Sequence, residues 1–288
     1  MPKKIVWLSS YPKSGNTWIR ILLSNLIYNP TGVTDINDIS VNRMSYSRKL
    51  FDEMIGLDTS LFNEKEEDDL RADAFISWGK NLKETVYIKA HELYYYDSKN
   101  RPVFPASVSS SVIYIVRNPL DVAVSFSNHL KTSIDKVIEH MNDINFNMTK
   151  MTGNNFQPML SQRLSSWSQN VLSWIDQDEI PVHIVKYEDL IKDDFSTFER
   201  LLSFLNLSYN KEEIKSAIDK SRFKNLQKNE SEKGFREQTS KEVSFFWKGE
   251  SGNWKKYLSS LQKDRILKEH GEVMNRLNYL DEKGNPIY

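Results

Sequence analysis

The stretch that decides the fold is SSYPKSGNTWIR, residues 9–20, which joins the apolar run KIVWLSS to a second apolar segment. The first run is almost continuously apolar, as is typical of a strand buried on both faces of a parallel sheet. In the second segment, residues 18–27, apolar side chains recur at the period of a helix. The stretch therefore predicts a strand, a tight turn around Gly15 and a helix that begins near Thr17.

This turn is suited to hold an anion. Backbone N–H groups at the start of a helix and the positive end of the helix dipole point to one place, where an anionic oxygen is stabilised. Lys13 adds a full charge there, and Ser14, Asn16 and Thr17 add short side-chain donors. The Walker pattern needs two glycines with the lysine after the second, whereas Lys13 precedes Gly15. A nucleoside triphosphate with magnesium is therefore disfavoured.

The rest of the chain repeats the strand-then-helix pattern. Three further β-rich runs occur: TVYIKAH from Thr85, SVIYIVRN from Ser111 and VHIVKYED from Val182. After the second of these, Asn118 suits a helix cap and Pro119 the first helical position. Strands that alternate with helices predict an α/β fold with a central parallel sheet flanked by helices, in a single domain over residues 1–288.

Composition limits the class of protein. The 39 Lys and Arg residues balance 39 Asp and Glu residues, so nucleic acid and membrane surfaces are not expected partners, and any anion site must be local. The absence of cysteine excludes disulfides and thiolate chemistry. No stretch reaches the roughly 18 apolar residues of a membrane span. The sequence therefore predicts a cytoplasmic protein.

Two polar segments carry weaker predictions. The acidic run NEKEEDD near Glu64 is typical of a solvated helix start or loop. The segment from Gln227 to Glu242 lacks apolar periodicity and predicts a loop, which we expect to close over a bound nucleotide.

The octet YPKSGNTW resembles the 5′-phosphosulfate loop of the cytosolic-type sulfotransferases, which use 3′-phosphoadenosine 5′-phosphosulfate (PAPS). The resemblance continues, in the family's order, through KAH (89–91), RNPLDVAVS (117–125), YED (187–189) and FFWKGESGNWKKYL from Phe245. It implies a P-loop-like nucleotide-binding fold, PAPS as the donor and adenosine 3′,5′-bisphosphate (PAP) as the spent product. The phosphosulfate is then held by Lys13, Ser14, Gly15, Asn16 and Thr17.

The resemblance also implies how the rest of the nucleotide is bound. Arg117 follows a predicted strand, and an arginine fork matches a phosphate with two charge-assisted hydrogen bonds. Ser125 lies about two helical turns beyond the Asn118 cap, on the same helix. By similarity, this pair binds the 3′-phosphate. Also by similarity, the adenine lies between aromatic faces, because stacking needs no particular hydrogen-bond pattern; the residues are Trp18, Tyr187 and Phe223, with Ser221 beside them.

The carboxyl-terminal motif departs from the family pattern. Lys248 and Gly249 stand where the family has a lysine and a glycine that complete the phosphate site. Trp247, however, occupies the place of an arginine. Phosphate affinity is then weaker, or a nearby residue such as Arg236 substitutes. Asn253 replaces an aspartate, which is a minor change.

His91 is the candidate general base. It stands at the end of a predicted strand, where a substrate can reach it, and a histidine can accept a proton near neutral pH. Lys89 lies two residues earlier, on the same face of the strand, and by similarity contacts the transferring group. We expect in-line sulfuryl transfer to a hydroxyl of a small phenol or alcohol. Lys13 would stabilise the developing charge, so no metal is required.

The acceptor itself is not identified by sequence. Candidate pocket segments are ELYYYD (92–97) and residues 31–80 and 131–162, which contain many aromatic residues and methionines. The family's usual dimer signature is not evident, so the oligomeric state stays open.

Two other functions remain open at this point. An ATP-dependent small-molecule kinase would need an acid to hold magnesium, and Asp121 or Asp189 could serve. A catalytically silent nucleotide-binding protein is the third possibility, and Trp247 favours it.

Overall fold

The computed structural model describes residues 3–148, 158–238 and 243–288. The chain groups into two compact units, each made of segments that are distant in sequence. Unit 1 comprises Met1–Tyr11, Asn42–Tyr114 and Asp143–Ile184, and unit 2 comprises Pro12–Val41, Ile115–Asn142 and Val185–Tyr288. That these units form a single domain stays a prediction.

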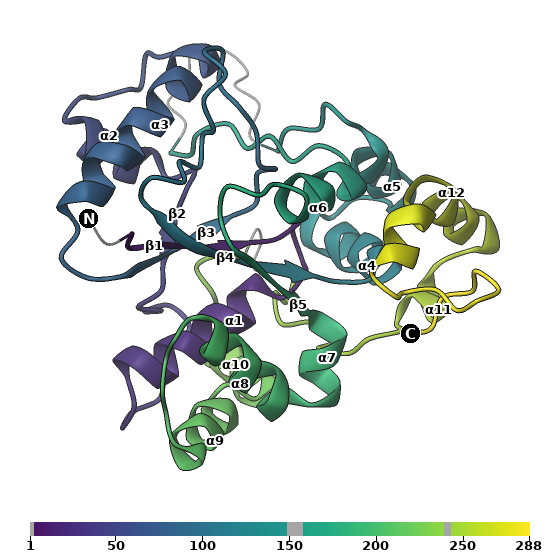
Figure 1. Cartoon of the computed structure of the whole chain (residues 1–288). Coiled ribbons are helices and arrows are strands. Elements are labelled where there is room, and N and C mark those ends of the chain that lie inside the picture. The colour runs from purple at the N-terminus through teal and green to yellow at the C-terminus, as the bar shows by residue number, and fades with distance from the viewer. Residues whose placement is uncertain (1–2, 149–157, 239–242) are drawn as a thin grey trace. The chain divides into compact units, whose positions relative to one another are not determined.

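A parallel sheet of five strands confirms the predicted fold class, and its strand order is β2-β3-β1-β4-β5 (Figure 1). The strands are β1 (Ile5–Ser9), β2 (Arg43–Met44), β3 (Val86–Ala90), β4 (Ser109–Val116) and β5 (Val182–Lys186). Four of them are the predicted runs. The fifth, β2, has two residues at the sheet edge and left no signal in the sequence. In the register, Ser9 lies between Ala90 of β3 and Tyr114 of β4.

The core of unit 1 forms around β1. Every residue of β1 and β3 is buried, which agrees with their continuous apolar runs. The Trp7 ring meets Phe75 and Phe104 edge to face, at centroid distances of 5.0 and 4.9 Å. Its indole N–H donates to Ser109 Oγ at 2.7 Å, so its polar atom is satisfied. In the edge strand β5, by contrast, only Val185 is buried.

The helices belong to one unit or the other. Unit 1 contains α2 (Arg48–Ile55), α3 (Glu64–Asn81) and α6 (Trp167–Ile175). Unit 2 contains α1 (Asn16–Leu23), the π-helical turn η1 (Ser24–Tyr28), α4 (Pro119–Leu130), α5 (Ile134–Asn142), α7 (Tyr187–Lys192), α8 (Asp194–Phe204), α9 (Lys211–Lys220), α10 (Phe223–Lys233), α11 (Trp254–Tyr257) and α12 (Ser260–Arg276). Across the described ranges, no helix is both long and apolar enough to cross a membrane.

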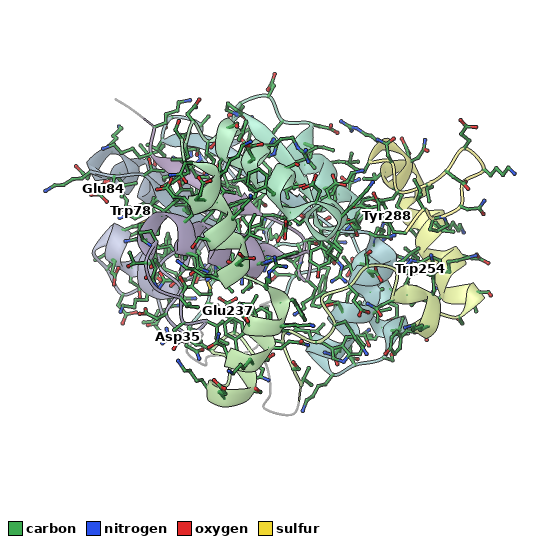
Figure 2. The ribbon with its side chains drawn as sticks, turned by 90° about the horizontal axis from the view of Figure 1, so that it is seen from below. Asp35, Trp78, Glu84, Glu237, Trp254 and Tyr288 are labelled. Atoms are coloured by element: carbon green, nitrogen blue, oxygen red, sulfur yellow. The ribbon has the colours of Figure 1, made fainter. Side chains whose placement is uncertain are left out.

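Two groups of helices pack within unit 2. The pair α1 and η1 contacts α9, and α8 contacts both α7 and α9. Separately, α4 contacts α5, α11 and α12. The indole N–H of Trp254 in α11 donates to the carbonyl of Tyr288 at 2.8 Å, which attaches the carboxyl terminus; Figure 2 labels both residues.

The two polar segments differ in part from their predictions. The acidic run does begin a helix, through a capping box between Asn63 and Glu66. It is not fully solvated, because Glu67 is buried and pairs with Arg48 at 2.5 Å. The predicted loop from 227 to 242 is wrong for residues 227–233, which continue α10 to Lys233. Residues 239–242 lie outside the described part.

Candidate functional site

The turn after β1 has the backbone of an anion-binding loop. Lys13 and Gly15 both have positive φ, at 66° and 103°, so N–H groups on either side of each residue can converge on one point. Gly15 is the N-cap of α1 and provides no side-chain cap. Other helices are capped, for example α2 by Ser47 and α6 by Ser166. The first turn of α1 is thus suited to receive an external acceptor.

Several buried donors in unit 2 have no hydrogen-bond partner among the described residues, and two of them belong to predicted nucleotide-binding residues. These two are Ser14 Oγ, in a residue 1% exposed, and Arg117 Nε, in a residue 8% exposed. Burying a donor without a partner is unfavourable, so a ligand that accepts hydrogen bonds from these two atoms would be stabilised. Both residues were predicted to hold the nucleotide.

Arg117 connects three parts of the predicted nucleotide site. Its Nη1 donates to the Lys13 carbonyl at 3.2 Å and its Nη2 donates to the Glu250 carbonyl at 2.9 Å. The guanidinium carbon lies 4.3 Å from the centroid of the Tyr187 ring. The turn after β1, the start of α7 and the carboxyl-terminal loop therefore all contact one cation.

The Tyr187 ring packs against the turn at Gly15. An added Cβ on Gly15 would lie 2.7 Å from Tyr187 Cδ2, so only glycine fits against this ring. Burial raises the pKa of the Tyr187 hydroxyl, which keeps it neutral. The next residue, Glu188, accepts hydrogen bonds from the Asn118 N–H and the Tyr279 hydroxyl, both at 2.9 Å. Burial also raises the Glu188 pKa.

The predicted adenine-binding residues come together only in part. The Trp18 indole N–H donates to the Ser221 carbonyl at 3.0 Å, and its ring meets Tyr187 edge to face at 5.9 Å. Trp18 is half-buried, so it is not a core residue. Phe223 instead packs on the backbone of Gly249, whose φ is 68° and where any Cβ would overlap the Phe223 ring.

The carboxyl-terminal loop is held by a residue that the sequence did not single out. The Glu230 carboxylate accepts the N–H groups of Phe245 and Phe246, at 2.5 and 2.9 Å. The Phe245 ring then lies 3.7 Å from Lys13 Nζ, as a cation–π contact. Trp247, the residue at the family's arginine position, has Lys248 Nζ 5.1 Å from its ring.

The remaining nucleotide predictions stay predictions. Ser125 lies on α4 and is half-exposed. Arg236, the suggested substitute for the missing arginine, is exposed, and its backbone N–H donates to Asn37 Oδ1 at 2.7 Å. The adjoining Glu237, labelled in Figure 2, pairs with the buried Arg20 at 2.6 Å.

Asp121 has a structural role that weakens the kinase alternative. One carboxylate oxygen accepts the Gly252 N–H at 2.7 Å and the other accepts the Trp254 N–H at 3.0 Å. These bonds fix the start of α11. Asn253, which replaces an aspartate of the family motif, lies between the two residues that Asp121 binds. Within the described residues, no group of three or more His, Asp or Glu side chains could hold a metal ion.

The candidate base lies in unit 1, with its tautomer set by the backbone. His91 Nδ1 is 2.8 Å from the Ser10 carbonyl and 3.2 Å from Ser10 Oγ. A carbonyl can only accept, so Nδ1 carries the proton and Nε2 carries the lone pair. The Tyr46 ring lies nearly parallel to the imidazole, with 6.2 Å between centroids. Lys89 Nζ is 5.9 Å from the same Tyr46 ring.

Sequence reasoning missed most of the residues around His91. Ser10 and Tyr46 carried no signal of their own. Within ELYYYD, Glu92 is wholly buried and paired with Arg71 at 2.6 Å. Tyr94 and its neighbour Tyr95 are buried, and their place in an acceptor pocket stays a prediction. Among the acceptor segments, residues 149–157 lie outside the described part.

The predicted residues divide cleanly between the units. All those assigned to the nucleotide lie in unit 2, whereas His91 and Lys89 lie in unit 1. Within unit 2, contacts join Lys13, Arg117 and Tyr187, and they join Trp18 to Ser221 and Phe223 to Gly249.

Curated proteins of similar sequence are sulfotransferases. A 3-beta-hydroxysteroid sulfotransferase of Cavia porcellus is 31% identical over 179 residues, which is 60% of this chain and 60% of that protein. A flavonol 4′-sulfotransferase of Flaveria chlorifolia is 27% identical over 280 residues, covering 91% of this chain and 77% of that protein. The aligned part of this chain thus spans less than two thirds of the guinea pig relative.

Solved structures share the fold. Mouse sulfotransferase SULT7A1 complexed with PAP superposes with a TM-score of 0.60 at 20% identity, covering 99% of this chain and 88% of that one. Retinol dehydratase in complex with androsterone and PAP gives 0.63 at 18% identity, covering 95% and 82%. The family model described as "Sulfotransferase domain" matches residues 3–278. The chain therefore belongs to the sulfotransferase domain family.

Proposed function

We propose that this protein transfers the sulfuryl group of PAPS to a hydroxyl of a small-molecule acceptor, with His91 as general base. The observation that carries the proposal is the cradle in unit 2. An uncapped helix start, the cation of Lys13 and the two unpartnered donors of Ser14 and Arg117 belong to the same loop or touch it. Such a set of donors suits a ligand with more than one anionic group.

The residues present fit PAPS. Ser14, Lys13 and the first turn of α1 would hold the phosphosulfate, and Arg117 would hold a phosphate of the same nucleotide. When bound, PAPS supplies the sulfuryl group and leaves as PAP. The close approach of Tyr187 to Gly15 gives the nucleotide a rigid aromatic wall. The places of Ser125, Trp247 and Lys248 at the 3′-phosphate remain part of the proposal.

The chain's own residues then handle proton and charge. His91 Nε2 accepts the acceptor's hydroxyl proton, while the Ser10 carbonyl holds the Nδ1 proton and stabilises the imidazolium. Lys13 and Lys89 supply positive charge to the transferring group. Ser10, which holds His91, precedes Lys13 by only three residues in the chain. Lys13 is the residue that we propose neutralises the leaving group.

The surroundings of Tyr46 favour an acceptor with an apolar body. Tyr46 belongs to a buried cluster with Phe51, Ala74 and Leu160, and Met44 is packed against it. This cluster adjoins the imidazole through the parallel Tyr46 ring. Two of the relatives are named for a 3-beta-hydroxysteroid and a flavonol, which are hydroxyl compounds with a largely apolar ring system. We place the acceptor of this chain in that chemical class.

The test combines nucleotide binding with transfer. Wild type, His91→Ala and a control histidine variant, His140→Ala, are titrated with PAP by calorimetry and incubated with PAPS and a panel of phenols, hydroxysteroids and flavonols. Mass spectrometry detects sulfated products. We expect His91→Ala to bind PAP like wild type but to lose transfer by at least about 100-fold, the usual contribution of a general base. His140→Ala should retain activity.

Two results would contradict the proposal. Wild type that binds PAP but sulfates nothing in the panel would indicate a nucleotide-binding protein without turnover. A larger thermal stabilisation by ATP with magnesium than by PAP would indicate a kinase.

A further inference from the structure

The backbone N–H and carbonyl of His91 are both held by side chains. The His91 N–H donates to Glu92 Oε2 at 3.1 Å, and the His91 carbonyl accepts from Asn170 Nδ2 at 2.9 Å. The carbonyl of Glu92 accepts from the Trp174 indole N–H at 2.9 Å. His91 immediately follows the last residue of β3, Ala90, where ladder hydrogen bonding ends. Beyond Ala90, side chains instead of neighbouring strands therefore hydrogen-bond to the backbone.

Glu92 is itself fixed by groups other than His91. Its side chain is wholly buried, with Oε1 accepting from Arg71 Nη2 at 2.6 Å and Oε2 accepting from Ser45 Oγ at 2.8 Å. Arg71, 1% exposed, also donates to the Tyr95 hydroxyl at 3.1 Å and the Ser45 carbonyl at 3.3 Å. The carboxylate that binds the His91 N–H is thus anchored from α3 through Oε1 and from the residue after β2 through Oε2.

A buried ion pair of this kind adds little to the free energy of folding. Removing two charges from water offsets most of their attraction, and apolar residues of similar volume often stabilise a fold as well. Such a pair can, however, define a unique position for the groups that it contacts. Here the contacted group is the backbone of the candidate base, and the direction of the imidazole follows from that backbone.

We propose that Glu92, anchored by Arg71 and Ser45, is a positioning residue for His91. It holds the His91 peptide so that the Nδ1 proton reaches the Ser10 carbonyl and Nε2 faces the acceptor hydroxyl. The inference rests on the proposed role of His91 as general base. Small errors in the position of a base reduce the rate strongly, since proton transfer needs a hydrogen-bonded geometry.

The experiment compares two double variants that differ only in the acceptor atom. In Arg71→Met/Glu92→Gln the amide oxygen can still accept from the His91 N–H, whereas in Arg71→Met/Glu92→Met no acceptor remains. Both lack the ion pair, and urea denaturation of each variant measures the stability that it loses. The matched control is another buried pair of unit 1, Arg48 and Glu67, treated in the same two ways.

We expect the Gln variant to keep kcat within about threefold of wild type and the Met variant to lose at least about tenfold, the effect of one hydrogen bond on an oriented group. The Kd for PAP should stay within about twofold in both, because the nucleotide residues lie in unit 2. Both Arg48 and Glu67 control variants should unfold at lower denaturant concentration, yet keep kcat within about twofold.

The tautomer of the His91 ring distinguishes a loss of positioning from a loss of stability. In ¹⁵N spectra of labelled imidazoles, with the His91 signal assigned from His91→Ala, wild type and the Gln variant should show the Nδ1–H tautomer. The Met variant should show a mixture of tautomers. Equal kcat in the Gln and Met variants, or an unchanged tautomer in both, would overturn the proposal.

Two further variants keep the test decisive. If the Met variant does not fold, Ser45→Ala removes one anchor of Glu92 Oε2 while preserving the ion pair, and kcat should fall about two- to fivefold; an unchanged kcat would overturn the inference. His91→Ala with wild-type transfer would instead show that the proposed function is wrong, a failure distinct from that of Glu92.

Discussion

Gly15→Ala tests whether the turn at Gly15 binds a nucleotide or is an ordinary turn. Gly15 has φ of 103°, where an L-residue is strained by about 1–2 kcal/mol. The new Cβ would lie 2.7 Å from Tyr187 Cδ2 and 3.2 Å from Cε2, and overpacking of this kind costs about 1–3 kcal/mol. The two effects sum to about 2–5 kcal/mol in the free energy of unfolding.

The same strain should appear in nucleotide affinity. The loop can relieve the overlap only by moving the start of α1 or the Tyr187 ring, and both belong to the proposed binding surface. If PAP binding restores the original geometry, at least about 1.4 kcal/mol of that strain returns, which weakens Kd at least about tenfold. Calorimetric titration with PAP measures this directly, and urea denaturation measures the loss of stability.

Gly56→Ala is the control. Gly56 also has positive φ, 77°, at the end of α2, but no atom lies within 4 Å of its added Cβ. We expect only the backbone strain, about 1–2 kcal/mol, and an unchanged Kd for PAP. A Gly15→Ala protein that binds PAP as tightly as wild type would refute the argument that this loop and the Tyr187 ring form the nucleotide site.

Three further outcomes are expected. Burial lowers the pKa of His270 to about 4 from its ordinary 6.5, so the folded protein favours the neutral ring. The wild type should therefore lose about 3 kcal/mol of unfolding free energy as the pH falls from 6.5 to 4, whereas His270→Leu should not. Urea titrations at several pH values measure this loss. Parallel pH profiles would contradict this. Trp247→Arg should restore a fork donor and raise the preference for PAP over AMP about tenfold in calorimetry, whereas Trp247→Ala should not. Arg117→Lys keeps the charge but loses the planar fork, so Kd for PAP should weaken about 10- to 100-fold; a Kd within twofold of wild type would remove Arg117 from the phosphate site.

Local patterns predicted a large part of the fold. The turn at Gly15, the Asn118 cap with Pro119 behind it, and four of the five strands follow from interactions within a few residues, and the structure contains them. The two-residue strand β2 was invisible because it is too short for any periodicity. The helical continuation of α10 to Lys233 was missed because its polar sequence hides the burial of Glu230.

The sequence by itself determined the strand, turn and helix that present Lys13, because apolar periodicity and glycine geometry act over neighbouring positions. Only the tertiary structure decided what those residues meet. That Glu92 binds Arg71 and Ser45, and that Phe245 lies on Lys13, depends on contacts between positions far apart in the chain. Such contacts leave no periodic trace, because they arise from the packing of whole elements.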